Sequence, residues 1–193
     1  MHAFLLSLGV IFVAELGDKS QLMALAFSTR FSAWRVLIGI SIATAVTHAV
    51  SVGIGDLVGA NIGLRWVSLA SGLAFLGFAA WTLRGDELGE DDEAAAAAVS
   101  GRTALATIGA VGVTFFLAEL GDKTMLATIT LATREGPVGT WGGSTVGMVA
   151  ADALAIVVGR QLGSRLPERT IRIGAAVAFV VFGALLLVEA GRG

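Results

Sequence analysis

The sequence predicts an all-α integral membrane protein with six transmembrane helices, arranged as two three-helix repeats of inverted topology. Composition is the first reason: 55% of the 193 residues are hydrophobic and only 15% are charged, whereas a soluble domain carries about 25% charged residues. Apolar runs long enough to cross a bilayer are the second reason. An internal repeat is the third, and it predicts the two inverted halves.

Six apolar segments follow one another along the chain. Each has the roughly 20 residues that a helix needs to cross a hydrocarbon core of about 30 Å. The runs lack period-two alternation, which favours helices over strands, and a helix satisfies its own backbone hydrogen bonds in lipid. The predicted segments are residues 2–29, 34–60, 64–84, 103–133, 137–163 and 167–190.

A polar, acidic stretch at residues 85–102 separates the third segment from the fourth. We expect it to link a first repeat at 1–84 to a second repeat at 103–193. Most arginines between the segments fall on one side of this topology, and the positive-inside rule places that side in the cytoplasm. We therefore expect the protein in the cytoplasmic membrane, with both termini outside and the acidic linker in the cytoplasm.

The two halves align without a gap at an offset of 104 residues. The hexapeptide Ala14–Lys19 recurs as Ala118–Lys123, and Ser20 aligns with Thr124. Each half holds three segments, an odd number, so the second half must enter the membrane from the opposite side. Inverted repeats of this kind are usual in secondary transporters, whose ligand sites lie near the midplane where the repeats meet. The two copies of the hexapeptide are therefore expected to face each other.

Both copies place charged side chains inside apolar segments. Inserting one charge at the centre of a membrane helix costs about 2.5–3.5 kcal/mol. The residues concerned are Glu15, Asp18 and Lys19 in the first repeat and Glu119, Asp122 and Lys123 in the second. An acid at i and another at i+3 share a helix face, so two such faces would surround one cavity with four carboxylates. That cavity would suit a hard divalent cation such as Ca²⁺ or Mn²⁺.

Neighbouring residues could complete such a site. Ser20 and Thr124 offer hydroxyl groups, and Gln21 offers an amide oxygen. The glycines of the motif, Gly17 and Gly121, lower helix propensity, so a local distortion could turn backbone carbonyls toward the cation. Four close carboxylates cannot all remain ionised and unpaired, so the group would hold either protons or a divalent cation.

A plainer interpretation treats the charges as ion pairs within each helix. Glu15 with Lys19, and Glu119 with Lys123, are i,i+4 pairs of favourable orientation that could assist membrane insertion. This interpretation leaves Asp18 and Asp122 unexplained, and it does not explain the duplication. A mixed role is also consistent with the pattern, in which the lysines balance the excess negative charge of the empty site.

At a second pair of aligned positions, the two repeats carry side chains of different chemistry. His48 and Asp152 occupy equivalent positions in the second and fifth segments, both in apolar surroundings. A proton-relay or gating role fits both residues. A hydrogen-bonded structural role fits His48 equally well, and it fits an acid at mid-membrane less well.

The duplicated motif resembles the signature of the Ca²⁺:H⁺ antiporter-2 family, the small Ca²⁺/Mn²⁺ exchangers of bacterial, plastid and Golgi membranes. That signature is Glu, an apolar residue, Gly, Asp, Lys or Arg, then Ser or Thr, and it occurs here as Glu15–Ser20 and Glu119–Thr124. The resemblance covers essentially the whole chain. It implies export of Mn²⁺ or Ca²⁺ from the cytoplasm in exchange for protons, with the motif acids as ligands, and for a compact chain it favours Mn²⁺.

Other functions remain open at the level of sequence. The carboxylates could bind an organic cation or an amino acid for export, or they could serve a metal-dependent intramembrane hydrolase. They could also pair helices in an assembly subunit that transports nothing. The absence of cysteine excludes thiolate chemistry. We expect no enzyme activity, no resident cofactor and no nucleic-acid partner, and the oligomeric state stays open.

Overall fold

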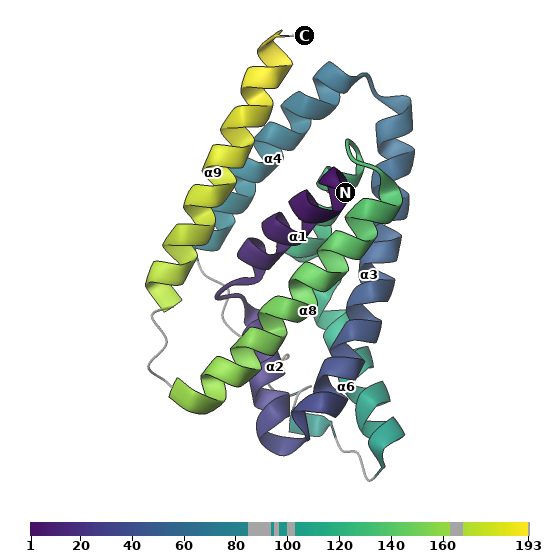
Figure 1. Cartoon of the computed structure of the whole chain (residues 1–193), viewed down its shortest axis with the longest axis vertical. Helices are drawn as coiled ribbons and strands as arrows, with labels where there is room; N and C mark the ends of the chain where they lie inside the picture. Colours follow the sequence, from purple (N-terminus) through teal and green to yellow (C-terminus); the bar gives the residue numbers. More distant parts are fainter. Residues whose placement is uncertain (85–93, 95–96, 100–102, 163–167, 193) are drawn as a thin grey trace.

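The computed structural model describes residues 1–84, 94, 97–99, 103–162 and 168–192, and within these ranges every regular element is an α-helix. The all-α prediction is confirmed for this part of the chain (Figure 1). The helices are α1 His2–Glu15, α2 Lys19–Arg30, α3 Ala33–Asn61, α4 Leu64–Arg84, α6 Ala104–Glu119, α7 Lys123–Ala132, α8 Pro137–Leu162 and α9 Glu168–Arg192.

The predicted continuous segments 2–29 and 103–133 are wrong in one respect, because each is broken within its motif. The first break follows Glu15, where α1 ends, and α2 begins at Lys19. At the centre of each break a glycine has a positive φ, 76° at Gly17 and 79° at Gly121. Glycine adopts this conformation without the steric cost that a Cβ imposes. The acid before each break and the aspartate after it therefore do not share a helix face.

Four helices are long and apolar enough to cross a membrane: α3, α4, α8 and α9. The helices α6 and α7 pass the same test only as a pair, bent by 74° at the second break, which would give a fifth span. The helix α1 is apolar but has 14 residues, fewer than a span requires. The membrane class thus agrees with the sequence, while the number of six spans stays a prediction.

The long helices pack in matching pairs, with α1 along α8, α6 along α3, and α4 along α9 (Figure 1). Glycine permits the close approach. A Cβ added to Gly39 of α3 would lie 2.8 Å from the carbonyl oxygen of Ile108 in α6. In the same way, Gly143 of α8 lies against the backbone of Phe4 in α1. Gly143 is equivalent to Gly39 under the 104-residue offset, and Ile108 is equivalent to Phe4. The two contacts are therefore the same contact in the two repeats.

Aromatic side chains fill the contact between α4 and α9. Phe75 lies edge-on to Phe182, with ring centroids 4.7 Å apart, and also meets Phe179 and Phe78. Such tilted and edge-to-face pairs stabilise an apolar contact beyond the area that they bury. The α4–α9 pair is thereby held together as one packed unit.

The two termini lie in the same half of the molecule, with the C-terminal end of α9 farther out than the N-terminus (Figure 1). Side chains tie this part together: His2 Nδ1 lies 3.2 Å from Glu135 Oε2, and Arg134 Nη2 lies 2.6 Å from Glu189 Oε2. Most of the acidic linker predicted at 85–102 lies outside the described residues, and the predicted boundaries of the two repeats stay a prediction.

Candidate functional site

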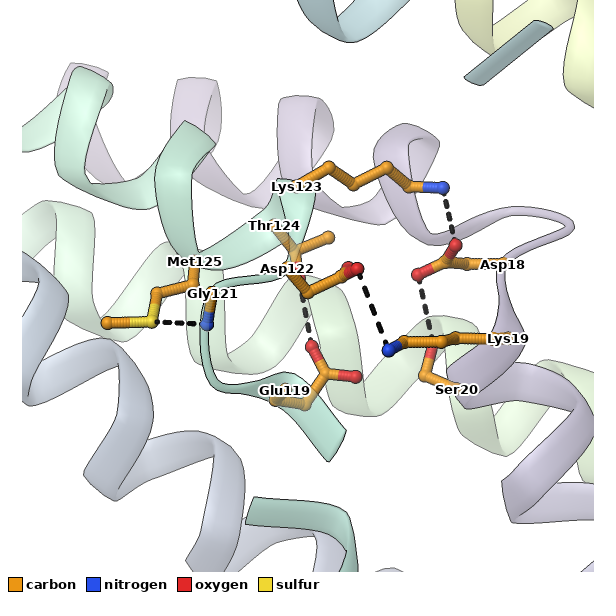
Figure 2. A network of polar contacts seen from close by, with 9 residues as sticks. All are labelled: Asp18, Lys19, Ser20, Glu119, Gly121, Asp122, Lys123, Thr124 and Met125. Atoms are coloured by element: carbon orange, nitrogen blue, oxygen red, sulfur yellow. Dashed lines mark hydrogen bonds and ion pairs between the residues drawn. The ribbon is translucent and has the colours of Figure 1, made fainter. Parts of the chain in front are cut away.

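The two breaks lie opposite each other in the interior, and each places its acids at helix ends (Figure 2). The glutamate of each motif is the last residue of a helix, and the aspartate is the N-cap residue of the next. All four carboxylates are buried, with exposed fractions of 0% for Glu15, 0% for Asp18, 2% for Glu119 and 5% for Asp122. The fold therefore brings the four predicted acids to the same interior region.

A side chain from the following helix satisfies the backbone at each break. The Gly17 N–H donates to Gln21 Oε1 at 2.9 Å, and the Gly121 N–H donates to Met125 Sδ at 3.3 Å. Gln21 and Met125 are equivalent under the offset, so the device is the same although the acceptors differ. In this structure Gln21 supports the break, and its predicted role in cation coordination stays a prediction. Met125 was not identified from the sequence, although its alignment with Gln21 was a usable signal.

The lysines cross between the motifs. Lys123 Nζ donates to Asp18 Oδ1 at 2.5 Å, and Lys19 Nζ lies 4.0 Å from Asp122 Oδ1 (Figure 2). Each lysine is thus paired with the aspartate of the other repeat. Because the Lys123 and Asp18 side chains are only 3% and 0% exposed, theirs is a buried ion pair that joins the two halves.

The intrahelical pairs suggested by the sequence do not form among the described residues. The helix ends at the glutamate, so the lysine four positions later is not one turn away. Both carboxylate oxygens of Glu15 are buried and accept no hydrogen bond within the described ranges. Glu119 Oε2 accepts from Thr124 Oγ1 at 3.0 Å, and its Oε1 accepts none there. The glutamates thus lack the cationic partners that the aspartates have.

The equivalent hydroxyl groups serve different acids. Thr124 donates to the glutamate of its own motif, as above, whereas Ser20 Oγ lies 3.4 Å from Asp18 Oδ2 and donates to it. Both hydroxyl residues are buried. The sequence placed these hydroxyls near the acids, and the structure agrees.

Asp152 of α8 lies among the charges of this region. It is close enough to Glu15, Glu119 and Asp18 for their charges to interact. His48 of α3, at the equivalent position, is 1% exposed, and its Nδ1 has no hydrogen-bond partner among the described residues. Alignment alone does not show which of the two positions meets the motifs.

The acids do not converge into a coordination sphere in this structure. No group of three or more His, Asp or Glu side chains in the described ranges is arranged to hold a metal ion. The two ammonium groups instead supply the positive charge beside the aspartates. The arrangement is therefore a buried acid cluster that is partly neutralised by lysines, and it could exchange those charges for protons or for a cation.

Known proteins resemble this chain over most of its length. The family described as "Divalent cation/proton antiporter GDT1" matches residues 3–90 and 103–193. The "Putative manganese exporter" of Vibrio cholerae is 30% identical over 190 residues, which cover 94% of this chain and 88% of that protein. The chloroplastic protein PAM71 of Arabidopsis thaliana is 32% identical over 212 residues, covering 97% of this chain but 56% of that protein.

A further relative, GDT1-like protein 5 of Arabidopsis thaliana, is 27% identical over 95% of this chain and 94% of its own length. No solved structure matches. The family match extends over both repeats, so the resemblance seen in the duplicated hexapeptide is confirmed. This chain belongs to the GDT1 family of divalent cation/proton antiporters.

Proposed function

We propose that this protein exports Mn²⁺ or Ca²⁺ from the cytoplasm in exchange for protons, with Glu15, Asp18, Glu119 and Asp122 as the cation ligands. One observation carries the proposal: acids from both motifs are buried in a single region, where two lysines pair across the repeats. Buried charges of this kind in a membrane protein mark ion and proton pathways. The cation is cargo, and the proposal includes no resident cofactor and no enzyme activity.

The lysines balance the charge of the aspartates. Lys19 and Lys123 together carry two positive charges, and each is paired with an aspartate of the site. A divalent cation that takes the place of two protons on the glutamates adds no net charge. With the ammonium groups kept within the cluster, the empty and loaded states carry nearly the same net charge, which limits the cost of burying charge at mid-membrane.

The glutamates supply the coupling to protons. Both oxygens of Glu15, and one of Glu119, accept no hydrogen bond in the described part of the chain. An ionised carboxylate in such a place costs several kcal/mol unless it is neutralised. Either a proton or the cation can neutralise it, so the two compete for the same oxygens, and that competition is the basis of exchange.

Contacts between equivalent residues support six spans in two inverted repeats. Thr44 Oγ1 lies 3.5 Å from Met148 Sδ, and these residues are 104 positions apart. A position that meets its own counterpart lies beside a two-fold pseudo-axis. The axis would therefore pass between α3 and α8, close to the motifs, where inverted-repeat transporters bind their ligands.

The position of the α4–α9 pair supports alternating access. The pair breaks the symmetry, because α4 packs on α7 and α9 packs on α1, while the described residues show no comparable contact of α9 with α2 or of α4 with α6. If the two repeats exchanged conformations, the α4–α9 pair would move so that α9 packs on α2 and α4 packs on α6. We propose that these are the two states, with both termini outside and the acidic linker cytoplasmic.

Transport by the purified protein in liposomes tests the proposal. A proton gradient should drive Mn²⁺ or Ca²⁺ flux through the wild-type protein, and Glu119→Gln or Asp122→Asn should abolish it. Asp56→Asn removes an exposed carboxylate of α3 and is the matched control, whose flux should remain. Undiminished flux in both motif variants would show that these acids do not bind the cation.

A further inference from the structure

The two halves differ chemically at one buried position beside the motifs. Asp152 of α8 and His48 of α3 are equivalent under the 104-residue offset and are 0% and 1% exposed. They lie one helical turn beyond Met148 and Thr44, which contact each other across α3 and α8. The same place in the fold therefore holds an acid in one repeat and an imidazole in the other.

Asp152 is buried, and it has no hydrogen-bond partner among the described residues. Both of its carboxylate oxygens are inaccessible, and neither accepts a hydrogen bond from any described residue. Its charge acts on the glutamates of both motifs, Glu15 and Glu119, and it feels the charge of Asp18. No hydrogen bond from a described residue explains an acid at this place, whereas three of the acids already assigned to the cation interact with its charge.

Gln21 ties α8 to the first motif at this level. Its Nε2 donates to the carbonyl oxygen of Ala151 at 3.0 Å, while its Oε1 accepts from the Gly17 N–H at 2.9 Å. The turn of α8 that carries Asp152 is thereby fixed to the first break. Met125, the equivalent of Gln21, accepts from Gly121, and its thioether has no hydrogen to donate to α3.

We propose that Asp152 is a fifth carboxylate ligand of the transported cation, and that the cation lies off the pseudo-axis, toward α8 and the first motif. This inference rests on the proposed function and extends its ligand set. Ca²⁺ takes six to eight oxygen ligands, and Mn²⁺ also favours carboxylates. Asp152, near Glu15, Glu119 and Asp18 and with no hydrogen-bond partner among the described residues, supplies such oxygens, while His48 contributes none.

Equilibrium binding of Mn²⁺ to the purified protein, followed by the loss of the spectrum of free Mn²⁺ in electron paramagnetic resonance, tests this assignment. Asp152→Asn keeps the shape of the side chain and should raise the Kd at least tenfold. His48→Asn changes the equivalent position and should alter the Kd less than threefold. An Asp152→Asn variant that binds within threefold of wild type would overturn the proposal, as would an equal loss in both variants.

The absence of cysteine from the chain permits a second test that does not depend on affinity. Asp152→Cys and His48→Cys each introduce the only thiol. With Co²⁺ as the probe, a thiolate that ligates the metal gives a sulfur-to-metal charge-transfer band. The band should appear with Asp152→Cys and not with His48→Cys; its absence from an Asp152→Cys protein that binds Co²⁺ would overturn the proposal. A wild-type protein that binds neither Mn²⁺ nor Co²⁺ would instead refute the proposed function itself.

Discussion

The crossed ion pair between Lys123 and Asp18 gives a quantitative prediction. Their side chains are 3% and 0% exposed, with the nitrogen and oxygen 2.5 Å apart. Removing one partner of a buried pair leaves the other charge uncompensated and costs about 3–5 kcal/mol. We therefore expect Lys123→Met to lower the free energy of unfolding by about 3–5 kcal/mol in the absence of divalent cations.

The second crossed pair provides the internal control. Lys19 lies 4.0 Å from Asp122, and its side chain is 20% exposed, so water screens the interaction. Lys19→Met should cost about 1 kcal/mol, near the upper value for exposed pairs. The assay is reversible unfolding in mixed detergent micelles, with the secondary structure followed by circular dichroism.

A double-mutant cycle isolates the pair itself. If Lys123 and Asp18 stabilise each other, Asp18→Asn combined with Lys123→Met should recover about 2 kcal/mol relative to the sum of the single changes. Additive effects, or a cost for Lys19→Met equal to that for Lys123→Met, would refute the reasoning that the crossed pair joins the two halves.

Three further predictions follow from the backbone and the acids. Gly121→Ala should cost about 1–2 kcal/mol of unfolding free energy because of its φ of +79°, whereas Gly109→Ala in α6, where a Cβ meets nothing within 4 Å, should not destabilise. Gly143→Ala should weaken the α1–α8 contact because its Cβ would strike the Phe4 backbone, while at Gly142 the nearest atom is 3.4 Å away; thermal melts compare the two variants. Mn²⁺ affinity should fall as the pH falls, since protons compete for the acids, and Mn²⁺ addition to weakly buffered protein should release protons that an indicator dye detects.

The sequence predicted the long helices well and the breaks poorly. The segments 34–60 and 137–163 correspond closely to α3 and α8, because a predominantly apolar stretch of more than 20 residues satisfies its backbone in lipid as a helix. At Gly17 the neighbours Glu15, Asp18 and Lys19 are charged, but apolar residues resume on both sides of the motif, so hydropathy alone does not separate two helices. The glycine indicates only that a distortion is possible, and the backbone conformation decides that the helix ends.

The pairing of the charges was beyond sequence reasoning for a similar reason. An i,i+4 rule applies only where a helix continues, and Lys19 begins a new one. Because the second half packs against this new helix, Lys19 pairs with Asp122 of that half. The duplication predicted that the motifs meet, whereas the crossed partners and the neighbours of Asp152 depend on tertiary packing.

The breaks also give the two acids of each motif different electrostatic surroundings. Asp18 is the N-cap residue of α2 and is paired with Lys123, so the positive end of a helix and an ammonium group both stabilise its charge. Glu15 ends α1, where the helix dipole is negative, and it has no hydrogen-bond partner among the described residues. The aspartate is thus suited to a permanent charge, and the glutamate to one that a proton or a cation must neutralise.

This difference predicts opposite balances of stability and transport for two isosteric changes. In the absence of cation a proton neutralises Glu15, so Glu15→Gln exchanges one uncharged side chain for another of the same shape. It should therefore change the free energy of unfolding by less than about 1 kcal/mol while abolishing exchange. Asp18→Asn leaves the Lys123 ammonium buried without its carboxylate. It should therefore lower the free energy of unfolding by about 3 kcal/mol and also abolish transport. Unfolding in micelles and flux in liposomes measure the two quantities on the same preparations. Equal destabilisation by the two variants would show that the helix break does not divide the roles of the acids.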